Sequence, residues 1–270
     1  MTLTYIDPNK LYDFILTKLR NDTKYGKIIN PEGFIKHLLA TGEKAREAAE
    51  DIVETNPFLD SVINPDLIER AGKLHDLGKT QQVEFHEVVG ADMVLKEGRA
   101  IGLVNGSEEE IKKGLEYIAD MMIPDFSIYE ELGRERYPEG ALYPKQLYGV
   151  LPGDSERVID KFEYLRRELS KKEDPLTIKE MCLPYTPQEM ILTWADMVGG
   201  NFYTVDERIQ DIIDRYGDEE SDYFNPMKVK ATKMARGRIV YICDLVDYLR
   251  ETSMMPYDAR INMNPQGFEP

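Results

Sequence analysis

Three histidines, all in the first third of the chain, are the residues best suited to chemistry: His37, His75 and His86. A single histidine on an apolar helix face is usually a hydrogen-bonded core residue, and that reading stays open for His37 and His86. His75 differs because Asp76 follows it directly inside an apolar segment. Neutral imidazole and ionised carboxylate are common metal ligands, so one cation beyond the helix end could satisfy both side chains. The pair could equally be a simple helix cap.

A second acidic side chain, Asp196, lies in the apolar segment MILTWADMVGG. This segment predicts a buried helix that ends at Gly199. A carboxylate near a helix C-terminus faces the negative end of the helix dipole, which costs about 0.3–1 kcal/mol. Asp196 is therefore either turned to solvent at the edge of the apolar stripe or paired with a cation.

These residues together resemble the H…HD…D signature of the HD-domain superfamily of metal-dependent phosphohydrolases. The resemblance rests on His37, on HDLGK with the pair of His75 and Asp76, on His86 in HEVVGA, and on Asp196. HDLGK followed by HEVVGA is similar to the HDIG subgroup, and TVDERIQDIIDRYG is similar to the helix that follows the last ligand in many members. The recognisable part covers about residues 33–250.

The resemblance implies a metal site with four protein ligands: His37, His75, Asp76 and Asp196. They would come from three separate helices of a bundle. Two imidazoles and two carboxylates suit a divalent transition ion such as Mn, Fe, Co, Ni or Zn, with open positions for water.

Three side chains receive catalytic roles from the same resemblance. Asp76 would accept the proton of the attacking water, although an aspartate that binds an ion through both oxygens is a poor base. Lys79 would sit in the turn after the pair, where its ammonium could meet a phosphate oxygen. A plain surface lysine is the alternative. His86 could hydrogen-bond the substrate or the attacking water, or it could be a capping or core histidine.

One departure from the family pattern concerns a second ion. Dinuclear members, including the HD-GYP phosphodiesterases, carry additional histidines on following helices, whereas the matching stretch here, LEYIADMMIPD, has none. Asp120 is the candidate ligand in that stretch. We therefore expect a mononuclear site, and the missing histidines argue against hydrolysis of cyclic dinucleotides and against a di-iron oxygenase.

The expected function is metal-dependent hydrolysis of a small phosphorylated metabolite, with a nucleotide favoured. A divalent ion lowers the pKa of bound water from about 15.7 towards about 7 and so provides hydroxide at neutral pH. Without the ion, we expect Asp76 and Asp196 to raise each other's pKa, because like charges disfavour ionisation. The alternative function is an HD-fold regulatory module that senses a nucleotide without turnover.

Helices must position these side chains, because nearly every periodic segment has apolar residues at intervals of three and four. Capping boxes at Thr186 and Thr204 open two helices in the second half of the chain. Further helices are expected over residues 8–20, 31–55, 67–77, 84–97, 108–122, 155–169 and about 225–250. No alternating β-branched run extends beyond a few positions. The predicted fold class is therefore all-α, and the resemblance implies a single HD-type helical bundle over residues 1–270 with its core at about 31–250.

The segment 123–153 and a set of basic residues each allow two interpretations. Residues 123–153 are rich in Pro, Gly and Tyr and predict an irregular insertion, which is either a lid or an ordinary surface loop. Basic residues could place positive charge at the mouth of the site, although a solvated surface is the better reading. These residues are Arg134, Arg136, Lys145, Lys228, Lys230, Lys233, Arg236 and Arg238.

The composition limits the partners of the protein. The formal net charge of −16 repels phosphate backbones and anionic membranes, so nucleic acid is an unlikely partner and a small phosphorylated substrate is expected. The start MTLTYIDPNK lacks the features of a secretory signal, and no apolar run approaches a membrane span. Only Cys182 and Cys243 could form a disulfide, so we expect a cytoplasmic protein with reduced thiols. An oligomer is possible.

Overall fold

The computed structural model describes residues 8–21, 30–81, 86–122, 186–199, 204–221, 224 and 226–253. Its α-helices are α1 (Pro8–Asn21), α2 (Pro31–Thr55), α3 (Pro65–Gly72), α4 (His86–Glu97), α5 (Glu108–Met122), α9 (Pro187–Val198), α10 (Val205–Gly217) and α11 (Pro226–Glu251). Two short 3-10 helices, η1 (Pro57–Leu59) and η2 (Leu77–Thr80), follow α2 and α3. No strand occurs among the described residues, and the predicted all-α class is confirmed.

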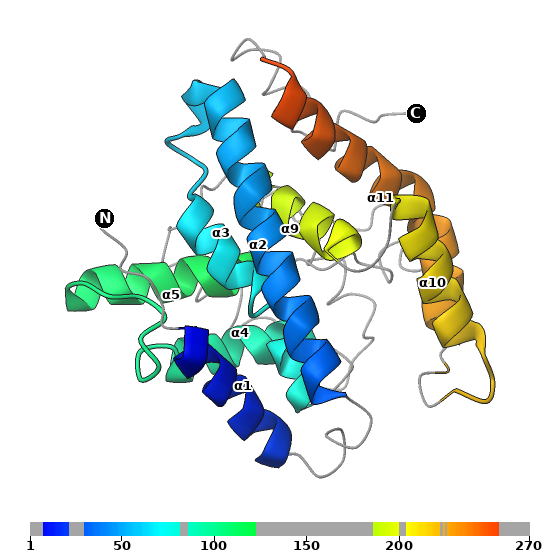
Figure 1. The fold of residues 1–270 in the computed structure, drawn as a ribbon, viewed down its shortest axis with the longest axis horizontal. Coiled ribbons are helices and arrows are strands. Elements are labelled where there is room, and N and C mark those ends of the chain that lie inside the picture. The colour runs from blue at the N-terminus through cyan, green and yellow to red at the C-terminus, as the bar shows by residue number, and fades with distance from the viewer. Residues whose placement is uncertain are drawn as a thin grey trace, which may run out of the picture.

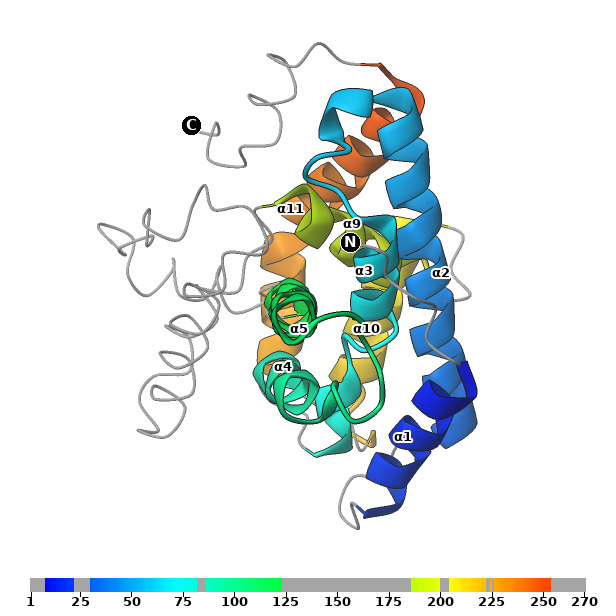
Figure 2. The same ribbon diagram turned by 90° about the vertical axis from the view of Figure 1, so that its left-hand side faces the viewer.

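The long helix α2 crosses the middle of the view in Figure 1 and runs along one side of the bundle in Figure 2. It packs against α3, α9 and α11, and α3 in turn packs against α5. Figure 2 shows α4 and α5 on the side of α3 away from α2, while α10 and α11 form a pair beyond α9 in Figure 1. Segments far apart in the sequence, α2 near the start and α9 and α11 near the end, are thus neighbours in the core.

Local sequence signals explain where α2 begins and which face it buries. The side chain of Asn30 caps the helix by accepting hydrogen bonds from the backbone N–H groups of Glu32 and Gly33, and Pro31 occupies the first turn. The buried face of α2 carries apolar residues at helical spacing: Ile35, Leu38, Ala45, Ala48, Ala49 and Ile52. Capping fixes the N-terminus, and burial of this stripe supplies most of the helix's stability.

The predicted helix over residues 67–77 is wrong in its second half, because α3 ends at Gly72. Beyond it the backbone tightens into turns, in which Leu77 N–H donates to the carbonyl of Leu74 at 2.8 Å. Both leucines are fully buried, so the apolar pattern continues although the helix does not. Apolar periodicity alone could not locate this break, since a buried turn continues the same stripe.

Some expectations lie outside the described residues. These are the insertion at 123–153 and the helix at 155–169, while the start of the helix expected at 84 falls partly outside because 82–85 are not described. Among the helices that are described, none combines the length and the apolar character needed to cross a bilayer.

Candidate metal centre

The close contact between α2 and α3 brings two histidines together. A Cβ atom on Gly72 would lie 2.7 Å from Cα of Gly42, a distance that real side chains do not tolerate. The two helices therefore cross at a point where neither can carry a side chain. His37 lies on α2 about one turn before this crossing, and His75 follows Gly72 by three residues. As a result Nε2 of His37 is 3.3 Å from Nε2 of His75.

The turn after α3 carries Asp76 and holds it against α4. Asp76 is the residue before η2, and its carbonyl accepts a hydrogen bond from Lys79 N–H at 2.9 Å. A Cβ atom on Gly78 would lie 1.9 Å from the carbonyl oxygen of His86. Glycine at this position thus lets η2 rest on the first turn of α4, where His86 begins the helix.

Helix α9 brings Asp196 to the same place from the other end of the chain. A complete capping box between Thr186 and Glu189 fixes its N-terminus, as predicted. Asp196 lies in the last turn, and its side chain is 27% exposed, so it is half-buried. The predicted burial of the surrounding apolar residues is confirmed, because Ile191, Trp194 and Ala195 are buried in the core.

The side chains converge at distances that suit one shared ion. Atoms Nε2 of His37 and Nε2 of His75 lie 3.2 and 3.3 Å from Oδ1 of Asp196. The same two nitrogens lie 3.8 and 3.6 Å from Oδ2 of Asp76. Ligands about 2.1 Å from a common ion are separated by about 3.0 Å in octahedral geometry and about 3.4 Å in tetrahedral geometry. The observed separations are of this size.

Two hydrogen-bonding features support the fit of a metal ion. Atom Nδ1 of His75 lies 2.7 Å from the carbonyl oxygen of Gly72. A carbonyl can only accept, so Nδ1 carries the proton and the lone pair of Nε2 faces Asp76 and Asp196. Oδ1 of Asp196 is buried and faces Nε2 of both His37 and His75, at 3.2 and 3.3 Å. A cation shared with these two nitrogens would offset the desolvation of this oxygen.

A family model described as HD domain matches residues 34–249. The chain belongs to the HD domain family. The match includes His37, His75, Asp76 and Asp196, and HD domains are generally metal-dependent phosphohydrolases. Neither the comparison with curated proteins nor the comparison with solved structures found a match.

In this HD domain the group formed by His37, His75 and Asp76 could hold a metal ion, with their ligand atoms within 4.8 Å of one another. Asp196 adjoins this group through the two histidines. Asp120 is not part of it. The structure thus brings together the four residues that the sequence singled out as ligands.

The electrostatics of the centre correct one expectation. Burial alone would raise the pKa of Asp76, but the ammonium of Lys79 and the imidazole of His75 hold that pKa well below its usual range. The pKa of Asp196 is likewise lowered against the effect of burial, chiefly by His75 and His37. The prediction that the two carboxylates raise each other's pKa is therefore wrong, because basic side chains face both of them.

The same carboxylates act on His75. Burial opposes the charged form of its imidazole, but Asp76 and Asp196 outweigh burial and raise the pKa of His75 to about 9. A proton on Nε2 would thus compete with a cation for the same position, since both are attracted by the same negative charge.

Lys79 and His86 both contact Asp76. Atom Nζ of Lys79 donates to Oδ2 of Asp76, and Nε2 of His86 lies 3.0 Å from Oδ1. His86 is buried, whereas the side chain of Lys79 is 26% exposed. The ammonium of Lys79 is thus the more accessible of the two groups, and the imidazole of His86 is placed to orient Asp76.

The predicted basic cluster on α11 is described only in part. Arg236 is exposed and pairs with Asp206 at 2.8 Å, and Lys233 is exposed as well. Arg236 and Lys233 are therefore ordinary solvated surface charges. The side chains of Lys228, Lys230 and Arg238, and the residues Arg134, Arg136 and Lys145, lie outside what the structure describes.

Proposed function

We propose that the protein is a metal-dependent phosphohydrolase that acts on a small phosphorylated metabolite, with a nucleotide as the favoured class. The observation that carries this proposal is the convergence of His37, His75, Asp76 and Asp196 from α2, the turn after α3, and α9. The HD domain family supports hydrolysis of a small molecule. The motifs HDLGK and HEVVGA favour the HDIG subgroup.

In this proposal His37, His75, Asp76 and Asp196 hold one divalent transition ion. When bound, such an ion would lower the pKa of a bound water and polarise the phosphoryl oxygen. The hydrogen bond from Nδ1 of His75 to the Gly72 carbonyl orients the ring, so that in the neutral imidazole the lone pair is on Nε2 and faces the ion.

The surrounding side chains have distinct roles. The low pKa of Asp76 keeps its carboxylate ionised, which favours a role as ligand and weakens it as a general base. Lys79 would meet the transferring phosphoryl group, because its ammonium is the exposed cation beside Asp76. His86 would act through Asp76 and hold Oδ1 in position.

Metal content and a substrate panel test this proposal. Protein purified without chelator is expected to contain about one equivalent of a transition metal, and the metal-loaded protein to release phosphate from a nucleoside mono-, di- or triphosphate or to open a cyclic nucleotide. If no transition metal can be restored, the proposal is wrong, and if no member of the panel is turned over, a nucleotide substrate is wrong. Tight nucleotide binding without turnover would instead identify a sensing module.

A further inference from the structure

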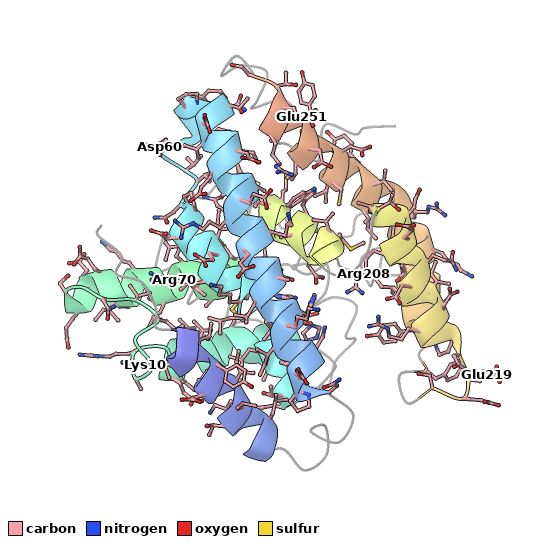
Figure 3. The ribbon with its side chains drawn as sticks, viewed as in Figure 1. Lys10, Asp60, Arg70, Arg208, Glu219 and Glu251 are labelled. Atoms are coloured by element: carbon pink, nitrogen blue, oxygen red, sulfur yellow. The ribbon has the colours of Figure 1, made fainter. Side chains whose placement is uncertain are left out.

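Helix α10 carries an arginine where its sequence pattern calls for an apolar residue. The inward face of α10 includes Val205, Ile209 and Ile212, which pack against the hydrophobic core. Arg208 lies beside this stripe, and its side chain is only 14% exposed. Figure 3 shows it on the flank of α10 that faces α9 and α2. An arginine turned inward suggests a binding role, since long charged side chains are normally solvated.

Helix α10 packs against α9, which carries Asp196, and its C-terminal part lies near Lys79. The helix begins shortly after α9, whose last turn holds Asp196, and a Cβ atom on Gly199 would lie 3.0 Å from Oγ1 of Thr41, one turn beyond His37 on α2. At the other end, Tyr216 lies close enough to Lys79 to affect its electrostatics. Arg208 lies in the first turn of α10, on the flank that faces α9 and α2, and so on the same side of the helix as the metal centre.

The charges of the metal centre favour an additional positive group when a phosphorylated substrate binds. Lys79 pairs with Asp76, and His75 lies between Asp76 and Asp196. A phosphoryl group adds about two negative charges beside these carboxylates, in a protein whose net charge is −16. A further cation beside the centre would offset this repulsion. Guanidinium is well suited, because it donates two parallel hydrogen bonds to a phosphate.

We propose that Arg208 binds the phosphoryl group of the substrate on the α10 side of the metal centre. This inference rests on the proposed phosphohydrolase function and adds a substrate-binding residue to it. Asp211 supports the arrangement, because its Oδ2 lies 3.2 Å from Nη1 of Arg208 and restricts the guanidinium from one side.

The same helix offers a matched control. Arg215 also pairs with Oδ2 of Asp211, at 2.5 Å, but its side chain is 43% exposed and it lies outside the inward stripe. Arg208 and Arg215 therefore share an ionic partner and differ in burial. Substitution of Arg215 removes the same charge from α10 at an exposed position, so we expect it to leave the site unchanged.

The test measures binding of inorganic phosphate to the metal-loaded protein by calorimetry, together with metal content and, for a hydrolysed substrate, KM and kcat. Arg208→Gln is expected to weaken phosphate binding and raise KM by at least about 10-fold, the loss of a hydrogen bond to a charged group. Arg208→Lys should lose less phosphate affinity than Arg208→Gln, because lysine keeps the positive charge but cannot donate two parallel hydrogen bonds. Arg215→Gln should stay within about 2-fold of the wild type, and all three variants should retain the metal.

The outcomes separate this inference from the proposed function. If the metal-loaded wild type binds phosphate and Arg208→Gln binds it equally well, the role of Arg208 is wrong and the function stands. If the wild type binds neither metal nor phosphate, the function and the inference fall together. Circular dichroism will show whether Arg208→Gln folds. If it does not, Arg208→Lys takes its place in the test. The inference is then wrong if Arg208→Lys binds phosphate as tightly as the wild type and has the same KM as Arg215→Gln.

Discussion

Each oxygen of Asp76 faces a different basic side chain. Lys79 contacts Oδ2 and His86 contacts Oδ1, and both approach from the η2 and α4 side. The two contacts differ in accessibility, since His86 is buried and Lys79 is partly exposed. At the scale of single residues, orientation of the ligand and contact with the substrate are thus divided between two side chains.

Lys79→Ala is expected to keep the metal and to lower kcat by about 100- to 1,000-fold, the usual effect of removing one group that stabilises transition-state charge. An ammonium has no lone pair for a metal, so metal content should not change. Metal analysis and steady-state kinetics measure the two effects. Lys96→Ala is the control, because Lys96 also pairs with an aspartate on its own helix, Asp92, but is 62% exposed. Full kcat in Lys79→Ala would contradict the assigned role.

At the scale of elements, the crossing of α2 and α3 sets the distance between the two histidines. Gly72→Ala is expected to destabilise the protein by about 1–3 kcal/mol, because its Cβ would meet the backbone of Gly42 at 2.7 Å. Separation of the helices should also weaken metal binding, since His37 and His75 would move apart. Urea denaturation and metal titration measure these effects.

Gly237→Ala is the matched control, because a Cβ there would meet nothing within 4 Å. This glycine lies inside α11, so alanine should stabilise the protein by about 0.5–1 kcal/mol. Equal stability in Gly72→Ala and the wild type would mean that the crossing can relax without cost.

An ionic contact between α2 and α3 also stabilises the packing of these two helices. Glu69 on α3 accepts hydrogen bonds from Arg46 on α2 at 2.9 Å and from Lys73 at 2.5 Å. Burial alone would raise the pKa of Glu69, but Lys73 and Arg46 lower it below its usual value of 4.5. A carboxyl with a depressed folded pKa stabilises the protein above its unfolded pKa, and this stability is lost as pH falls through the folded pKa.

Glu69→Gln is therefore expected to destabilise the protein by about 1–3 kcal/mol at neutral pH. The difference from the wild type should shrink as pH falls below about 4.5, because the unfolded carboxyl is protonated first and the folded carboxyl follows at its lower pKa. Urea denaturation of both proteins at several pH values gives the comparison. A difference that stayed constant down to about pH 3 would show that the carboxylate charge contributes nothing to stability.

Sequence patterns predicted some elements well and others poorly, for identifiable reasons. The bounds of α2 and α5 agree with the prediction, because capping residues and a regular apolar stripe mark them locally. The end of α3 did not follow from the pattern, since the close contact of Gly42 with Gly72 is tertiary and the buried turn keeps its apolar residues. Arg208, for which we propose a phosphate-binding role, was not singled out from the sequence, although an arginine beside the apolar stripe of α10 was a visible signal.

For the candidate site, residue types and the family resemblance were enough to choose His37, His75, Asp76 and Asp196, which the structure places together. Their charge interactions were not predictable in the same way. The low pKa values of the two carboxylates depend on which basic side chains lie within a few ångströms, and such distances follow only from the fold.

At the scale of the whole molecule, the candidate ligands connect parts of the chain that are far apart in sequence. His37 comes from α2, Asp76 from the turn after α3 and Asp196 from α9, and these elements also pack against one another in the core. A bound ion would therefore link three segments that separate on unfolding. The hydrophobic core does not depend on the ion, so the metal-free protein should remain folded.

Removal of the metal is thus expected to lower the melting temperature without unfolding the protein at room temperature. A free ion at about 100 times its dissociation constant stabilises the native state by about 2.7 kcal/mol. For a chain of this size that corresponds to a shift of about 5–10 °C. Calorimetry of the chelated and reloaded wild type measures the shift.

Asp196→Asn keeps the shape of the side chain and removes its charge, so it supplies the control for this experiment. We expect its metal affinity to fall by at least about 100-fold, more than the loss of an outer-shell partner causes. At the same metal concentration its melting temperature should then respond little to chelator, because the stabilisation depends on the ratio of free ion to dissociation constant. A variant that gained as much stability from the ion as the wild type would show that Asp196 is not a ligand.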